Sequence, residues 1–281
     1  MASALVRPII PETSDSFLGL CLDRQSVEQE LRSILSPAAR SPVSACMDYA
    51  VMGRGQRLRP LLAIRVGRLM RSEAALTRRA AAAIELVHCA SLIVDDLPCM
   101  DNDATRRNRP SAHIAYGEST ALLAAFGLVA LAARTVMEQE VPERFWGGQR
   151  RFQIALLRTL DCASLIGGQV MDLQLSGERR EQCRDILNDL KTVPLFLLAI
   201  EAGAAYAPAP PPPALKQFGR HYGAALQMTD DYLDGEALDI GPLEGQLAAA
   251  CDCLAPVGAA AGPLEELVEY LHARAQDYRH R

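Results

Sequence analysis

Apolar and polar positions recur with helical spacing along most of the chain. In the segment SVEQELRSIL, the apolar residues Val27, Leu31 and Ile34 fall four and three positions apart, as on one face of an α-helix. Ser26 with Gln29 three residues later predicts a capping box at the start of this helix, and Pro37 predicts its end. Similar spacing predicts helices over residues 42–52, 59–71, 75–97, 118–138, 146–177, 183–206, 214–235 and 263–278.

The predicted helices leave little room for strands, and no alternating pattern of useful length competes with them. Several segments are apolar on most sides, which is typical of central helices in a large bundle. Aromatic residues make up only 5% of the chain, while alanine and leucine dominate. We therefore predict an all-α fold, one large single-domain helical bundle over residues 1–281. Within it, residues 1–24 form a poorly ordered N-terminal segment and the proline-rich residues 207–214 a surface loop.

Composition excludes several classes of function. The net charge of −5 offers no global attraction for nucleic acid. The eight cysteines include no CxxC pair, and no secretory leader precedes them, so we expect reduced thiols in a cytoplasmic protein. The longest apolar run, residues 121–133, is shorter than the roughly 20 residues that a membrane span needs. We expect no stable membrane insertion.

Four aspartates follow an apolar run in the segment SLIVDDLPCMDNDATRR. His88 and Asp95 share one stripe of the predicted helix. Pro98 interrupts the helix and lets the chain turn, which would bring Asp101 back beside Asp95. The alternative is a solvated helix C-terminus, but acidic groups there oppose the helix macrodipole.

A second acidic group occupies the segment LQMTDDYLD, with Asp230, Asp231 and Asp234 near one helix face. Taken alone, such a group is usually a solvated surface. Two such groups and the pair Arg106–Arg107 suggest Mg²⁺ that bridges to phosphate, because clustered carboxylates repel unless a cation compensates them. No glycine-rich P-loop accompanies them, which excludes nucleotide chemistry of the Walker type.

Five motifs together resemble the trans-type isoprenyl diphosphate synthases. LVHCASLIVDDLPCMDNDATRRNRP is similar to the first aspartate-rich motif of that family, and LQMTDDYLD is similar to the second. GRGQRLRPLL, GGQVMDL and LKTVPLF resemble three further family segments. They occur in the family's order over about residues 45–235.

The resemblance implies the isoprenoid synthase fold, all-α around a deep central cavity, and usually a homodimer. It implies that isopentenyl diphosphate condenses with an allylic diphosphate and that diphosphate is released. Two or three Mg²⁺ ions would bind the allylic diphosphate through Asp95, Asp101 and Asp230, assisted by Asp96, Asp231 and Asp234. Allylic diphosphate would also contact Arg106, Lys191, Thr192 and Gln227; isopentenyl diphosphate would contact Arg59, His88, Arg107 and the position of Gln56.

The resemblance implies that the residues one helical turn before Asp95 control product length. In the family, bulky aromatics there block the growing chain, whereas this sequence has Ala90 and Ser91. The resemblance therefore predicts the C20 product geranylgeranyl diphosphate, with longer products if Phe126 does not plug the cavity. Small residues at these positions can equally serve helix packing.

Three features depart from the family pattern. Gln56 stands where the family has a lysine, with Arg54 two residues earlier as a possible substitute. Phe126 in AAFGL replaces an acidic residue, and the usual lysine-rich loop after the second motif is missing. Arg274, Arg279 and Arg281 could supply charge if the C-terminus folds over the cavity; we favour a solvated helix end.

The departures leave other functions open. The protein could prenylate a different acceptor, or act as a non-catalytic regulatory subunit of a synthase. Terpene cyclases also use aspartate-rich metal clusters, although the GxRxxP segment and the paired arginines fit chain elongation better.

Overall fold

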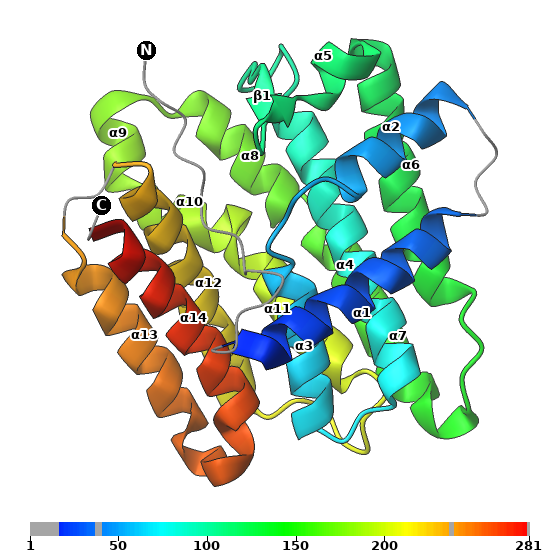
Figure 1. The fold of residues 1–281 in the computed structure, drawn as a ribbon, viewed down its shortest axis with the longest axis vertical. Helices are drawn as coiled ribbons and strands as arrows, with labels where there is room; N and C mark the ends of the chain where they lie inside the picture. Colours follow the sequence, from blue (N-terminus) through cyan, green and yellow to red (C-terminus); the bar gives the residue numbers. More distant parts are fainter. Residues whose placement is uncertain (1–16, 37–40, 236–238, 280–281) are drawn as a thin grey trace. The chain divides into compact units, whose positions relative to one another are not determined.

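A computed structural model describes residues 17–36, 41–235 and 239–279. The prediction of an all-α fold is confirmed: within the described residues, helices carry nearly all the regular structure, and one hairpin of two-residue strands accompanies them (Figure 1). The contacts group the chain into two compact units, which are described separately. Unit 1 comprises residues 1–61 and 78–141, and unit 2 comprises residues 62–77 and 142–281. The single domain expected from the sequence stays a prediction.

Unit 1 carries the first aspartate motif. In it α2 packs beside α6, and α5 contacts both of them (Figure 1). Its elements are α1 (Leu18–Leu35), α2 (Pro42–Val51), the start of α3 (Leu58–Leu69), most of α4 (Ala74–Asp95), β1 (Thr105–Arg106), β2 (Arg109–Pro110), α5 (Ala112–Tyr116) and α6 (Glu118–Met137).

The predicted capping box at Ser26 is wrong. Helix α1 begins at Leu18, and the Ser26 hydroxyl donates to the Asp23 carbonyl oxygen at 2.7 Å inside the helix. The upstream residues Leu20 and Cys21 are buried, so apolar packing extends the helix beyond the polar signal. A capping box does occur in α2, between Ser41 and Ser44. Residues 18–24 of the expected N-terminal segment therefore belong to α1, and residues 1–16 lie outside the described part.

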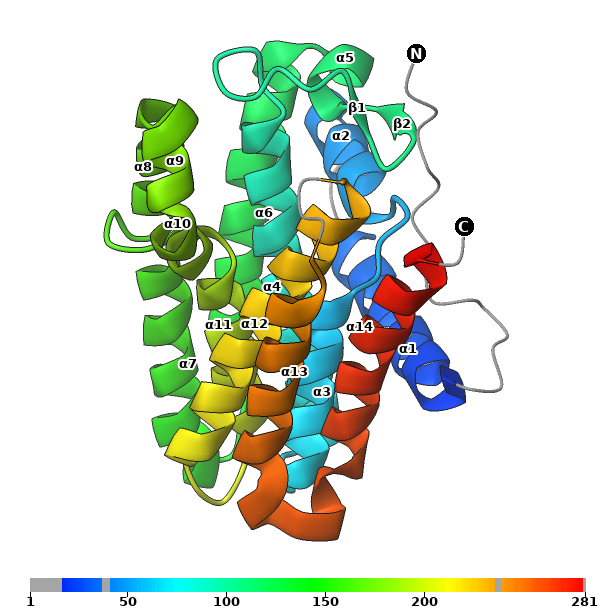
Figure 2. The ribbon, with the colours of Figure 1, turned by 90° about the vertical axis from the view of Figure 1, so that its left-hand side faces the viewer.

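Unit 2 carries the second aspartate motif. Here α12 packs against α11, α13 and α14, and α12, α13 and α14 run side by side in Figure 2. Its elements are the rest of α3, the first turn of α4, η2 (Glu143–Phe145), α7 (Trp146–Thr159), α8 (Leu165–Gln174), α9 (Gly177–Gln182), α10 (Arg184–Lys191), α11 (Val193–Ala204), α12 (Pro213–Leu233), α13 (Gly241–Leu254), η3 (Ala255–Ala261) and α14 (Gly262–Arg279).

Two long helices predicted for unit 2 are divided in the structure. The segment 146–177 forms α7 and α8, with a turn over residues 160–164 between them. The segment 183–206 is interrupted at Thr192, because Pro194 cannot donate a helical hydrogen bond and sits in the first turn of α11. The proline-rich stretch leads into α12, which begins at Pro213. Helix α13 was not predicted.

A buried ion pair holds the loop between α2 and α3. Arg57 has a positive φ of 58° and is buried, and its Nη1 donates to Glu85 Oε1 of α4 at 2.6 Å. Its Nη2 donates to the carbonyl oxygens of Val51 at 2.6 Å and Gly53 at 2.9 Å. One guanidinium therefore fixes both the backbone of this loop and its position on α4.

The eight cysteines all lie within the described residues, and no disulfide joins them. By length and composition alone, α6 and the stretch Gly241–Gln276 could span a membrane. Core helices of soluble proteins meet the same criterion, so these two matches are weak evidence.

The Arg57–Glu85 pair predicts a pH-dependent stability. Burial alone would raise the pKa of Glu85, but the charges of Arg57 and Arg107 and the Arg57 hydrogen bond lower the pKa below its ordinary value. A lowered pKa in the folded state stabilises the protein above the unfolded pKa of about 4.3, and this stability is lost as the pH falls through the folded value. We expect Glu85→Gln to lower the free energy of unfolding by about 3 kcal/mol at pH 7, because it leaves a buried arginine unpaired.

Denaturant unfolding between pH 7 and pH 3 measures the effect, and the difference between the two proteins should shrink toward pH 3. Glu30→Gln is the matched control, because Glu30 pairs with the exposed Arg79 at 3.4 Å. This control should change stability by less than about 1 kcal/mol. Equal losses in the two variants would contradict the assignment.

Candidate active site

The chain turns back on itself directly after α4. The backbone N–H of Asp101 donates to the carbonyl oxygen of Asp95 at 2.9 Å, and Asn102 N–H donates to the Leu97 carbonyl oxygen at 3.1 Å. Asn102 adopts a positive φ of 54°, which an asparagine tolerates well. The predicted return of Asp101 to Asp95 after Pro98 is therefore confirmed. Asp95 is half-buried and Asp101 is exposed.

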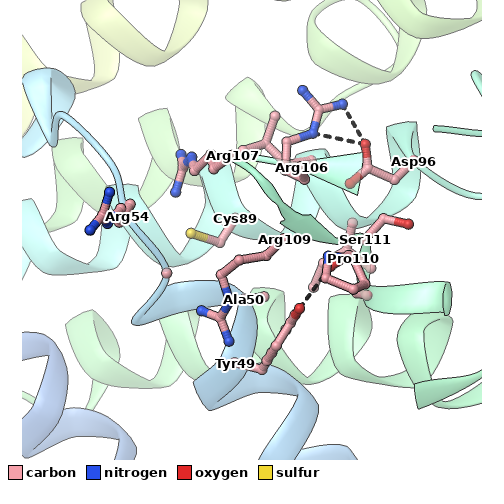
Figure 3. A pocket seen from close by; sticks show the side chains of 14 residues that line it. Tyr49, Ala50, Arg54, Cys89, Asp96, Arg106, Arg107, Arg109, Pro110 and Ser111 are labelled. Atoms are coloured by element: carbon pink, nitrogen blue, oxygen red, sulfur yellow. Dashed lines mark hydrogen bonds and ion pairs between the residues drawn. The ribbon is translucent and has the colours of Figure 1, made fainter. Parts of the chain in front are cut away.

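Asp96 has a different environment from Asp95 and Asp101. It is buried, and it accepts two hydrogen bonds from Arg106, one from Nε at 2.9 Å and one from Nη2 (Figure 3). The same Nη2 also donates to Asp103 at 3.1 Å. Burial raises the pKa of Asp96, and this effect is larger than the lowering by Arg106. The pKa of Arg106 is also raised: burial would lower it, but the hydrogen bond to Asp96 and the Asp96 charge raise it by more. We treat the two groups as an ion pair, because a guanidinium keeps its proton in proteins. Asp96 thus anchors Arg106.

A tight hairpin presents the second arginine of the pair. Strands β1 and β2 are joined by Arg107 and Asn108, which both have positive φ, 54° and 62°, as in a two-residue type I′ turn. Tyr49 of α2 secures the hairpin: its hydroxyl donates to the Pro110 carbonyl oxygen at 2.8 Å, and the Arg109 guanidinium lies 3.9 Å from its ring centroid. This contact stabilises an arginine backbone conformation that is otherwise unfavourable.

Arg107 reaches the loop that Arg57 holds. A Cβ atom added to Gly55 would lie 2.8 Å from Arg107 Nη1, closer than real Cβ contacts, and 3.1 Å from its Cζ, which is a tight contact. Glycine at this position therefore gives the guanidinium its space. The half-buried Gln56 follows it in the same loop.

The predicted contacts of isopentenyl diphosphate gather around α4. Arg59 Nη1 lies 3.3 Å from Nε2 of His88. Burial, followed by the charges of Arg59 and Arg107, holds the pKa of His88 well below its ordinary value. The imidazole is therefore neutral at physiological pH, and its Nε2 accepts the hydrogen bond because arginine can only donate. The structure thus brings Arg59, His88 and Arg107 together, and the buried Glu85 is the shared counter-ion of the two arginines.

A small cavity of about 40 Å³ opens beside this cluster. Its charged lining comes from the loop, the hairpin and the end of α4 (Figure 3): Arg54, then Arg106, Arg107 and Arg109, and Asp96. Arg109 was not among the predicted site residues, although it is the third arginine of the segment TRRNRP. Cys89 also lines the cavity, and burial raises the pKa of its thiol to about 11, so the thiol stays protonated. The cavity suits an anion.

In unit 2 the lysine–threonine segment and the second aspartate motif are connected. Lys191 Nζ donates to Asp172 Oδ2 of the GGQVMDL segment at 2.5 Å. Thr192 Oγ1 donates to Gln227 Oε1 at 3.0 Å, and Gln227 Nε2 donates to Asp231 Oδ1 at 2.7 Å. Three predicted residues therefore form one chain of hydrogen bonds that orients Asp231.

The aspartates of the second motif lie at the C-terminal end of α12. Asp230 and Asp231 are half-buried, and Asp234, at the end of the helix, is exposed. Arg274 of α14 is buried, and its Nη2 donates to Asp230 Oδ1 at 3.0 Å. The expectation of a solvated tail is therefore wrong for Arg274, because α14 packs along α12 and turns this side chain inward. The side chains of Arg279 and Arg281 lie outside the described residues.

The residues proposed to set product length do not line the cavity beside the hairpin. Ala90 is buried, and Ser91 is half-buried with its hydroxyl donating to the His88 carbonyl oxygen at 2.9 Å. Phe126 is 67% exposed on α6, so it does not fill the interior of unit 1. The product length stays a prediction.

The donor set of both motifs fits magnesium. Within the described part of the chain, no three His, Cys, Asp or Glu side chains gather closely enough to hold a metal by themselves. Mg²⁺ needs only one or two carboxylates, and it completes its octahedron with water and phosphate oxygens. Asp95 with Asp101, and the accessible carboxylates of α12, meet that need.

Comparison with known proteins gives the family. A profile described as Polyprenyl synthetase matches residues 40–239. A probable farnesyl diphosphate synthase of Sinorhizobium fredii is 35% identical over 239 residues, 80% of this chain and 70% of that protein. Geranylgeranyl pyrophosphate synthase 4 of Arabidopsis thaliana is 32% identical over 246 residues, 84% of this chain and 65% of that protein.

Solved structures agree with this result. The crystal structure of a geranyltransferase from Legionella pneumophila superposes with a TM-score of 0.85 at 30% identity, over 93% of this chain and 98% of that one. An FPP/GFPP synthase from Zymomonas mobilis gives a TM-score of 0.82 at 27% identity, over 91% of this chain and 98% of that one. Fold, motifs and relatives agree, and the chain belongs to the polyprenyl synthetase family of prenyltransferases.

Proposed function

We propose that the protein condenses isopentenyl diphosphate with an allylic diphosphate in a Mg²⁺-dependent reaction, gives geranylgeranyl diphosphate and releases diphosphate. The observation that carries the proposal is the gathering of Arg59, His88 and Arg107 in unit 1, the unit in which Asp101 returns to Asp95. A cationic cluster suits the diphosphate of isopentenyl diphosphate, which the product keeps. The acidic motif suits the Mg²⁺ that would bind the departing diphosphate of the allylic substrate.

On the allylic side, Asp95 and Asp101 of the first motif and Asp230, Asp231 and Asp234 of the second would hold two or three Mg²⁺ ions. Bound Mg²⁺ would neutralise negative charge on the departing diphosphate. Asp96 keeps the Arg106 guanidinium oriented through its two hydrogen bonds. Lys191, Thr192 and Gln227 supply donors, and Gln227 orients Asp231.

On the isopentenyl side, the neutral His88 accepts from Arg59 and fixes the direction of that guanidinium. Arg59 and Arg107 bind the diphosphate, while Arg54 provides positive charge that Gln56 cannot provide. The bond from allylic C1 to the diphosphate oxygen breaks, and the alkene of isopentenyl diphosphate attacks C1. A proton then leaves to an oxygen of the released diphosphate.

The C20 product is supported by small residues before the first motif. Ala90 and Ser91 lack the bulk that would stop a chain one turn from Asp95. The relatives' names divide between farnesyl and geranylgeranyl synthases, as in Escherichia coli and Arabidopsis thaliana, so the assignment depends on these two positions.

We also propose a cytoplasmic homodimer. Leu122, Leu123, Phe126 and Met137 are large apolar residues exposed on α6, and together they form an apolar stripe along this helix. A second copy of the chain would cover this stripe and remove it from water. Eight cysteines without a disulfide suit a reducing compartment.

A product assay tests the activity. Purified protein with Mg²⁺, isopentenyl diphosphate and allylic substrates of five, ten and fifteen carbons should yield a C20 product by mass spectrometry. Asp101→Asn should reduce the rate by at least about 100-fold, because it removes a carboxylate from the metal site. Cys99→Ser, two residues away on the exposed turn, is the control and should keep the rate. A protein that consumes no isopentenyl diphosphate but prenylates another acceptor would contradict the proposal, as would no turnover at any length.

The contact between Gly55 and Arg107 gives a second test. Gly55→Ala should displace the Arg107 guanidinium and raise KM for isopentenyl diphosphate about tenfold, the value of one charge-assisted hydrogen bond. KM for the allylic substrate should change little. Gly53→Ala is the matched control in the same loop, because its added Cβ would meet atoms no closer than 3.5 Å. Equal effects of the two substitutions on both substrates would argue against a role for Arg107 at the isopentenyl site.

The apolar stripe on α6 predicts the oligomeric state. Phe126→Asp should convert the dimer to a monomer, because it places an unpaired charge in an interface from which water is excluded. Size-exclusion chromatography with light scattering measures the change. Leu18→Asp changes a residue of similar exposure on α1 and should leave the dimer intact. A wild-type monomer, or a dimer that survives Phe126→Asp, would contradict the proposal.

A further inference from the structure

The second aspartate motif is in contact with a buried arginine from the C-terminal helix. The Arg274 side chain is 1% exposed, and its Nη2 lies 3.0 Å from Oδ1 of Asp230, whose side chain is 29% exposed. The two residues are 44 positions apart and belong to α14 and α12. The guanidinium thus approaches the motif from the protein interior, while the carboxylate also reaches solvent.

The charge around this motif makes the contact important. Three carboxylates lie within about one helical turn and repel one another, and the hydrogen bond that Gln227 donates to Asp231 comes from a neutral amide. The sequence has no lysine after Lys216, and Arg274 is the first arginine after Asp234. Arg274 therefore brings to Asp230 a positive charge that residues 235–273, which contain no lysine or arginine, cannot supply.

We propose that Arg274 is a built-in counter-ion of the second aspartate motif, which lowers the affinity of Asp230 for a free divalent cation. The proposal rests on the proposed function, in which this motif binds Mg²⁺. A guanidinium on one carboxylate oxygen cancels part of the charge that attracts a cation. Because Arg274 is buried, it cannot move into water when a cation arrives, and the repulsion persists.

The consequence concerns the order of binding. A divalent cation that meets a partly neutralised motif binds weakly by itself, but a diphosphate restores the missing negative charge. Arg274 thereby favours loading of this motif by the metal together with its diphosphate over loading by the free metal. Arg274 acts through Asp230 and does not touch the substrate, so it is a positioning residue.

Another buried arginine offers a matched control. Arg65 of α3 is also 1% exposed, and its Nη1 donates to Glu266 Oε2 of α14 at 2.7 Å and to the Pro263 carbonyl oxygen. This pair attaches the same helix to the same unit through Glu266, which is not an aspartate of the motif. Loss of either arginine removes a buried ion pair of α14, but only loss of Arg274 changes the charge at Asp230.

The experiment measures Mn²⁺ binding from the electron paramagnetic resonance signal of the free ion. All proteins carry Asp95→Asn and Asp101→Asn, so that binding reports on the second motif. Arg274→Gln keeps a hydrogen-bond donor but removes the charge, and it should tighten Mn²⁺ binding by about threefold or more. Arg274→Lys keeps the charge and Arg65→Gln leaves the motif untouched, so both should bind as the parent does. Inorganic diphosphate should narrow the difference between the parent and Arg274→Gln.

The outcomes separate the two proposals. Unchanged or weaker Mn²⁺ binding in Arg274→Gln, beside a parent that binds, overturns the role of Arg274 and leaves the proposed function standing. No Mn²⁺ binding by any variant, with or without diphosphate, overturns the metal role of this motif as well. Adding Asp230→Asn should abolish the effect of Arg274→Gln. If circular dichroism shows that Arg274→Gln does not fold, Arg274→Met replaces it with the same expected tightening.

Discussion

The buried carboxylate of Glu85 is the constraint on which the isopentenyl side of the candidate site depends. Guanidinium groups as close as those of Arg57, Arg59 and Arg107 repel one another, and burial increases that repulsion. Glu85 compensates them from the middle of α4, through a 2.6 Å contact with Arg57 and the charges of the other two. Burial, together with the charges of the same arginines, lowers the pKa of His88, so its neutral imidazole can accept a hydrogen bond from Arg59. One acidic residue thereby allows a basic site to exist before any phosphate arrives.

The residues of both aspartate motifs show a related arrangement, in which charged groups are already paired. Asp96 holds Arg106 in unit 1, and in unit 2 Lys191 contacts Asp172 and Arg274 contacts Asp230. A diphosphate that binds Arg106 or Lys191 must therefore compete with a carboxylate. Competition of this kind reduces the net affinity of the diphosphate, but it keeps the donors oriented before the ligand arrives. This competition favours diphosphates over ligands with one negative charge, because a ligand needs several negative charges to replace the carboxylates. A bound metal ion would then compensate the negative charge of the displaced carboxylates.

Helical periodicity and Pro98 were enough to predict the helices and the turn after α4, because both depend on residues that are close in the sequence. The helical class followed from periodicity, and the return of Asp101 to Asp95 followed from Pro98, because proline interrupts a helix wherever it stands. The capping box at Ser26 failed, since buried residues upstream extend α1 and packing outweighs a cap. The contact of Arg274 with Asp230 could not be predicted, because it joins positions 44 residues apart and depends on how α14 packs on α12. The family motifs identified the reaction class, but not which charges pair with which.

Position 56 is a glutamine and not a lysine, and the room that Gly55 leaves lets arginines from neighbouring segments supply positive charge there. Arg57 fixes the loop through three hydrogen bonds, so the backbone at Gly55 keeps one conformation. Without a side chain at Gly55, Arg107 can approach from the hairpin, and Arg54 lines the same cavity. Positive charge that the family places at one position is here supplied by neighbours on two separate segments. In the proposed function, this site would bind isopentenyl diphosphate only while the loop and the hairpin remain in contact. Tyr49, the residue that secures the hairpin, would then contribute to binding together with the arginines.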